Sequence, residues 1–88
     1  MIVKYRKSFF NDVGRLKQIS QIEDLEFITE FASITDKPEN IPGFKKLRQY
    51  PGKARIEMSL LRIGVEVEGN TLIFIRVLPR AIFYQQFP

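Results

Sequence analysis

Residues 61–78, which read LRIGVEVEGNTLIFIRVL, decide the fold. In the first half of this stretch every second residue is apolar, as in a strand that buries one face. Residues Gly69-Asn70 are a two-residue hairpin signal, because glycine tolerates the positive φ that such a turn requires. Residues 71–78 are apolar on both faces, which is typical of a central strand. The stretch therefore predicts a β-hairpin in the middle of a sheet.

A turn at Gly69-Asn70 sets Glu68 opposite Thr71, and the rest of the register follows from that pair. We expect the helices to cover the face that carries Leu61, Ile63, Val65 and Val67 together with Leu72, Phe74, Arg76 and Leu78. The opposite, open face then carries Arg62, Gly64, Glu66 and Glu68 together with Thr71, Ile73, Ile75 and Val77.

The preceding segment extends the open face. A turn at Ser59-Leu60 sets Glu57 opposite Arg62, Arg55 opposite Gly64 and Lys53 opposite Glu66. Cations then surround a gap at the glycine, with Arg80 and Tyr84 following the last strand. Converging guanidinium groups suit a phosphate backbone. An ordinary solvated face with cross-strand ion pairs explains the same pattern.

The remaining segments complete an α+β fold in one domain, residues 1–88. We expect a short strand over Ile2–Arg6, a helix capped by Ser8 that reaches Ile19, and a second helix that fades near Thr35. Ser20 and Glu23 have the spacing of a capping box for that second helix. An antiparallel sheet of three to four strands follows, beginning with a strand over residues 44–50 and ending in a short C-terminal tail, residues 80–87.

Composition excludes several classes of function. The 88 residues contain no Cys and no His, so disulfides and the usual transition-metal ligands are missing, and we expect no metal or cofactor. Charges stand within the first eight residues, and the longest apolar stretch is interrupted by Arg76, so we expect no membrane segment and a cytoplasmic protein. The net charge of +4 favours an anionic partner.

Four segments carry a resemblance to a known family. They are Lys45-Lys46-Leu47, the strand residues 62–67, the strand residues 74–78, and the tail with Arg80 and Tyr84. The order and spacing of these segments resemble the RelE/ParE toxin superfamily, in its RelE-like branch from bacterial type II toxin–antitoxin systems. The N-terminal strand and two helices are similar as well, so the resemblance spans nearly the whole chain.

The resemblance implies a metal-free endoribonuclease, an mRNA interferase that cuts mRNA on the ribosome and is inhibited by a cognate antitoxin. In that chemistry a ribose 2′-hydroxyl attacks the adjacent phosphodiester, and basic side chains stabilise the developing charge. Arg62 would bind the scissile phosphate, Arg80 matches the family's catalytic-site arginine after the last strand, and Tyr84 would stack on a base or aid proton transfer. The ribosome, mRNA and antitoxin are the expected partners, and no small-molecule substrate is expected. The expected RNA-binding cations are Lys45, Lys46, Arg48, Lys53 and Arg55.

Departures from the family pattern leave alternatives open. Glu57 stands where relatives have a basic residue, and Pro79 where many have a histidine. Glu57 opposite Arg62 would partly neutralise the phosphate-binding residue and weaken cleavage. The alternatives are a non-catalytic member that acts through its antitoxin in a co-repressor complex, and a gyrase-poisoning ParE-like toxin. The basic face and Tyr84 favour the nuclease over the gyrase poison.

Overall fold

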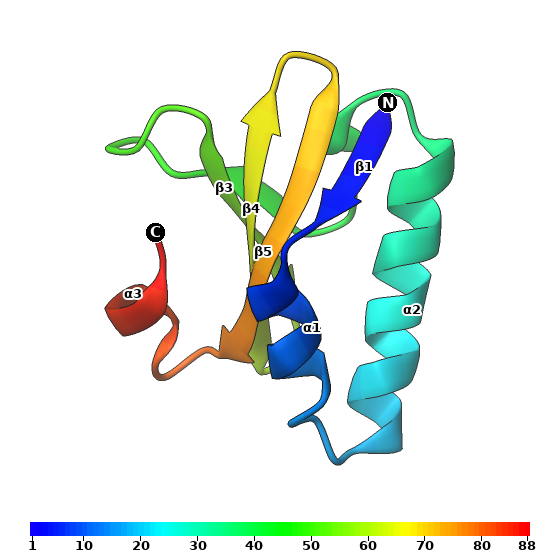
Figure 1. The fold of residues 1–88 in the computed structure, drawn as a ribbon, viewed down its shortest axis with the longest axis vertical. Helices are drawn as coiled ribbons and strands as arrows, with labels where there is room; N and C mark the ends of the chain where they lie inside the picture. The colour runs from blue at the N-terminus through cyan, green and yellow to red at the C-terminus, as the bar shows by residue number, and fades with distance from the viewer.

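A five-stranded sheet forms the centre of the structure, a computed structural model that describes all residues 1–88 (Figure 1). Its strand order is β1-β5-β4-β3-β2. The strands are β1 (Ile2–Tyr5), β2 (Phe44–Lys46), β3 (Lys53–Met58), β4 (Leu61–Glu68) and β5 (Thr71–Pro79). The helices are α1 (Lys7–Val13), α2 (Ile19–Ile34) and α3 (Phe83–Gln86), with a 3₁₀ turn at Pro38–Asn40.

The predicted α+β class is confirmed, and the sheet is larger and less regular than expected. β1 joins it beside β5, with Ile2 opposite Thr71, and the two strands run parallel. All other pairings are antiparallel, so the sheet is mixed. The strand predicted over residues 44–50 stops at Lys46, because the chain turns at Leu47 to reach β3.

The two hairpins have the predicted turns. Ser59 adopts a φ of 55° in the β3–β4 turn, and the pairs Glu57–Arg62 and Lys53–Glu66 form as expected. In the β4–β5 hairpin the predicted register holds from Glu68–Thr71 to Val65–Phe74. Beyond that point a bulge shifts the register by one residue.

The bulge corrects the predicted faces of β5. Gly64 lies opposite Arg76, so Ile75 is the extra residue. Val77, predicted on the open face, is buried in the core beneath α1 and α2, while Leu78, predicted beneath those helices, packs near α3. Arg76, also predicted beneath the helices, instead binds Asp12. The expectation for Arg76, Val77 and Leu78 was therefore wrong.

α1 fills the edge of β5 that β1 leaves unpaired beyond Tyr5. The Ser8 hydroxyl donates to the carbonyl oxygen of Ile75 at 2.6 Å, so it does not cap the helix as predicted. The buried Asp12 carboxylate accepts the amide of Val77 at 3.0 Å and the Arg76 guanidinium at 2.7 and 3.0 Å. Side chains of α1 thus take the place of a neighbouring strand.

The helix boundaries differ from those expected. α1 ends at Val13, and Gly14, a poor helix former, stands at its C-cap, so the helix does not reach Ile19. α2 begins at Ile19 and makes no side-chain cap hydrogen bond, so the predicted capping box at Ser20 and Glu23 does not form. None of the helices is long and apolar enough to cross a membrane.

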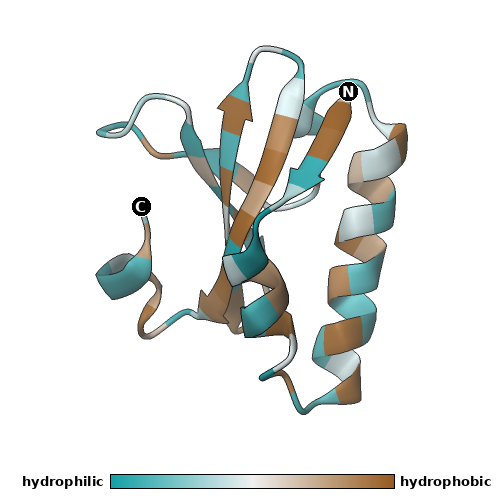
Figure 2. Ribbon diagram, viewed as in Figure 1, coloured by the Kyte–Doolittle hydropathy of each residue, from teal (hydrophilic) through white to brown (hydrophobic).

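Apolar residues are frequent along β5 and alternate with polar residues along β4 (Figure 2). The buried ones form one cluster on each face of the sheet. The main core lies between the sheet and the helices α1 and α2, and it includes Ile63 and Val65, both fully buried as predicted. A smaller cluster lies on the opposite face beneath α3 and consists of Leu47, Leu78, Phe83 and Phe87. The face expected to be open is therefore partly covered by the C-terminal tail.

We expect Asp12→Ala to destabilise the protein by about 2–3 kcal/mol, because it leaves the Arg76 guanidinium and the buried Val77 amide without their acceptor. Urea unfolding followed by circular dichroism measures the change. Asp24→Ala, at an exposed position on α2, is the matched control. Equal unfolding midpoints for the two variants would show that Asp12 does not hold this edge.

Candidate nucleic-acid interface

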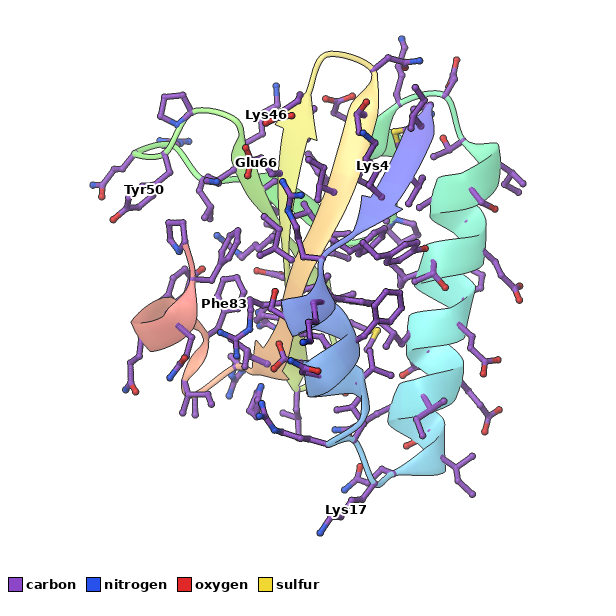
Figure 3. All side chains as sticks on the ribbon, viewed as in Figure 1. Lys4, Lys17, Lys46, Tyr50, Glu66 and Phe83 are labelled. Carbon is purple, nitrogen blue, oxygen red and sulfur yellow. The ribbon has the colours of Figure 1, made fainter.

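A groove of about 910 Å³ lies between the loop that joins β2 to β3 and the C-terminal tail. Figure 3 shows Tyr50 projecting at the tip of that loop and Phe83 pointing from α3 toward the sheet. We call this hollow the cationic groove, because four Lys and Arg side chains line it and no Asp or Glu side chain does. Its charged and aromatic lining residues are Lys45, Lys46, Arg48, Arg55, Tyr50, Tyr84 and Phe87.

The strand pairing and the tail bring these side chains together. β2 runs antiparallel to β3, so Lys45 lies directly opposite Arg55. α3 places Tyr84, 60% exposed, on the other wall, with its ring centroid 6.0 Å from the Arg55 guanidinium carbon. At that distance the cation is attracted to the face of the ring. The groove thus combines cations with aromatic surfaces.

Glu57 lies on β3 and binds two of the cations that line the groove. It accepts the Arg55 Nε at 3.0 Å and lies 3.2 Å from the Lys45 Nζ. Hydrogen bonds from Arg55 and then from Lys45 lower the pKa of Glu57, so it is ionised at neutral pH. These two contacts hold Arg55 and Lys45 in place and reduce the positive charge available to a ligand.

Arg62, the predicted phosphate-binding residue, does not line the cationic groove. Its side chain is only 13% exposed, and its Nη1 donates to the carbonyl oxygens of Ser59 at 3.0 Å and Leu61 at 2.8 Å. Glu57 was expected to neutralise Arg62, but their separation of 4.0 Å is the longest of the three Glu57 contacts. Glu57 therefore acts mainly on Arg55 and Lys45.

The other predicted residues occupy separate places. Arg80 is exposed just after β5, where its amide donates to the Leu60 carbonyl oxygen, and its side chain makes no ion pair. Lys53 lies 2.6 Å from Glu66, and its hydrogen bond is the main cause of the lowered pKa of that carboxyl. Lys53 lines a second hollow of about 510 Å³ on the far side of the β2–β3 loop.

The structure therefore brings five of the eight predicted residues to one groove: Lys45, Lys46, Arg48, Arg55 and Tyr84. Sequence reasoning missed Tyr50, which is 49% exposed in this groove. The signal was its position immediately before the Pro51-Gly52 turn, which projects it from the sheet. No cluster of three metal-ligating side chains is present. Cations interleaved with exposed tyrosines suit a polyanion that also offers planar groups for stacking.

Comparison with known proteins identifies relatives along the whole chain, although no protein-family profile matches it. Toxin RelE3 of Methanocaldococcus jannaschii is 36% identical over 93 aligned positions, which cover 100% of both proteins. The toxin–antitoxin complex RelB-RelE from Methanococcus jannaschii contains a chain that superposes with a TM-score of 0.84 at 29% identity, covering 97% of this chain and 99% of that one.

A more distant likeness extends the fold comparison. The toxin–antitoxin complex RelBE2 from Mycobacterium tuberculosis gives a TM-score of 0.64 at 19% identity, with 91% of each chain covered. The DinJ-YafQ complex from E. coli gives 0.61 at 16% identity, with 93% of this chain and 96% of that chain covered. At these identities the likeness shows a shared fold.

We expect Glu57→Gln to strengthen binding of a short single-stranded RNA at neutral pH, because it releases Lys45 and Arg55 from their carboxylate. One additional phosphate contact should steepen the dependence of log K on log salt concentration by about one. Fluorescence anisotropy across a salt series measures both effects. The difference from the native chain should vanish as pH falls through the lowered pKa of Glu57, where the native carboxyl is itself neutral.

Glu66→Gln is the matched control, since it makes the same charge change beside Lys53, outside the cationic groove. Equal gains in affinity for the two variants would show that net charge alone, and not the groove, controls binding.

Proposed function

The chain belongs to the RelE family of toxins, and we propose that it is the toxin of a type II toxin–antitoxin system that cleaves mRNA on the ribosome. The observation that carries this proposal is the cationic groove, which is lined by four cations and two exposed tyrosines. Glu57 pairs with Arg55 and Lys45, and Lys46 and Arg48 remain exposed at the rim. The ribosome and mRNA are then its targets, and the cytoplasm is where it acts.

The groove supports single-stranded RNA as the ligand. Lys46 and Arg48 are exposed at its rim, where they can contact successive phosphates. Tyr50 and Tyr84 offer rings on which unpaired bases can stack, each worth about 1–3 kcal/mol. Double-stranded RNA keeps its bases stacked inside the helix and cannot use these rings. An mRNA held open for decoding presents phosphates and bases together.

Cleavage would need no metal or cofactor. The 2′-hydroxyl oxygen attacks the adjacent phosphorus, loses its proton, and expels the 5′-oxygen, which gains a proton; the products are a 2′,3′-cyclic phosphate and a 5′-hydroxyl. We assign Tyr84 to stacking or proton transfer, because it is exposed in the groove and its ring centroid lies 6.0 Å from the Arg55 guanidinium carbon. We assign to Arg80 and Arg62 the stabilisation of the negative charge that develops on the phosphorane.

The two arginines differ in the contacts that their side chains already make. Arg80 has no side-chain partner and is free to meet a phosphate. Arg62 must first exchange its hydrogen bonds to the Ser59 and Leu61 carbonyl oxygens for bonds to the phosphate. That exchange, with Glu57 nearby at 4.0 Å, makes cleavage weaker than in relatives with a basic residue at position 57.

We expect Arg80→Ala to lower mRNA cleavage by about 10²-fold, because it removes a charge that stabilises the phosphorane. A similar loss in Tyr84→Phe would assign proton transfer to the hydroxyl, and a retained rate would assign stacking, because Phe keeps the ring. Primer extension on mRNA from translating ribosomes measures cleavage, with growth arrest on induction as a second readout. Tyr5→Phe is the matched control, since Tyr5 stacks on Phe74 at 5.1 Å and lies outside the groove. If the native chain neither cleaves mRNA nor slows growth, the non-catalytic co-repressor takes the place of the nuclease.

An antitoxin is the proposed protein partner. The charge of the chain is unevenly distributed, because α2 contains four carboxylates and no cation although the whole chain carries +4. The remaining surface, including the cationic groove, is therefore strongly basic. A disordered antitoxin segment with acidic and apolar residues would cover the groove and order as it binds.

We expect Arg48→Glu to weaken the complex with the product of the adjacent gene by about tenfold, because it places a carboxylate in the groove that receives the acidic segment. Calorimetry on the co-expressed pair, separated and remixed, measures the affinity. Lys17→Glu makes the same charge change on the exposed segment between α1 and α2 and should leave affinity nearly unchanged. Recovery of free toxin alone after co-expression would count against an antitoxin encoded there.

A further inference from the structure

Gly64 leaves room on the sheet for the C-terminal tail to pack against it. Gly64 lies in the middle of β4, between Arg55 on β3 and Arg76 on β5. Its φ is not positive, unlike that of Gly43, so its backbone alone does not call for glycine. The reason is space, because a Cβ at position 64 would lie 2.7 Å from atoms of the Phe87 ring.

The ring over Gly64 is the outer anchor of the tail. Phe87 is 3% exposed, and its ring centroid lies 5.3 Å from that of Phe83, which is fully buried. The Phe87 amide donates to the Phe83 carbonyl oxygen at 2.9 Å and closes the single turn of α3. Four residues of helix are not stable alone, so the two rings must hold this turn in place.

The same turn presents Tyr84 to the cationic groove. The Tyr84 ring packs edge-on against Phe83, with 5.0 Å between centroids, and lies 6.0 Å from the Arg55 guanidinium. Arg55 is the residue directly opposite Gly64. Gly64, which makes room for Phe87, and Arg55, which lies beside Tyr84, are therefore neighbours on two paired strands.

We propose that Gly64 is a positioning residue, which admits the Phe87 ring and thereby holds Tyr84 against Arg55 in the groove. The contribution to cleavage rests on the proposed nuclease function; the contribution to the position of Tyr84 does not. A displacement of about 1 Å in a reacting group can cost up to about 10²-fold in rate. A single methyl at position 64, which must push the ring away, is large enough to have that effect.

The test compares Gly64→Ala with the native chain by two measurements. In NMR spectra, the native protein should show Overhauser contacts between the Tyr84 ring and the Arg55 side chain, and Gly64→Ala should lose them. Cleavage on translating ribosomes should fall by about 10- to 100-fold. Gly14→Ala is the matched control, because a Cβ there meets no atom closer than 3.5 Å. It should retain both the contacts and the cleavage.

A double-mutant cycle separates positioning from damage to the strand. Phe87→Ala removes the ring without changing β4 and should reproduce the loss of contacts and of cleavage. Adding Gly64→Ala to Phe87→Ala should cause no further loss, because the methyl then has no ring to displace. Additive losses, or Tyr84–Arg55 contacts that survive in Gly64→Ala, would overturn the proposal. If no variant and not even the native chain cleaves mRNA, the nuclease assignment fails, and the NMR arm still decides the position of Tyr84.

Discussion

The buried carboxylate of Asp12 is the interaction on which the arrangement of both faces depends. It accepts the Val77 amide and the Arg76 guanidinium just beyond the bulge at Ile75, and so stabilises the shifted half of β5. With the shift, Val77 enters the main core and Leu78 turns toward α3. In the unshifted register Val77 and Leu78 would exchange faces, and the tail would lose Leu78 from the cluster that it packs on. One acid on α1 thus stabilises the register that places Leu78 on the far face of the sheet.

Much of this fold could be predicted from local patterns. The alternation in residues 61–68 and the Gly69-Asn70 turn predicted the central hairpin, and the Ser59-Leu60 turn predicted the pairing of Arg55 with Gly64. The bulge could not be predicted, because residues 71–78 are apolar on both faces and one extra residue leaves no break in an apolar run. The parallel pairing of β1 was also hidden, since a strand of four residues carries no signal for its neighbour.

The candidate site was also predictable from the sequence only in part. The predicted Ser59-Leu60 turn placed Arg55 opposite Gly64, but no partner strand was predicted for β2, so the pairing of Lys45 with Arg55 came from the structure alone. The direction of a long side chain after it leaves the sheet depends on the partners it finds. Arg62 turned back to two carbonyl oxygens, and Glu57 selected Arg55 and Lys45 as its closest partners. Tyr50 reached the groove through the shape of a loop, which its residue type alone does not specify.

The position of α2 has a consequence for how the molecule meets a polyanion. α2 and the C-terminal tail cover opposite faces of the sheet, so four carboxylates lie on the side away from the cationic groove (Figure 1). This separation makes the molecule an electric dipole. In the field of an RNA, such a dipole experiences a torque that turns the groove inward and α2 outward before any contact forms. Orientation during approach then raises the rate of productive encounters, and dissolved salt, by screening the field, removes that advantage.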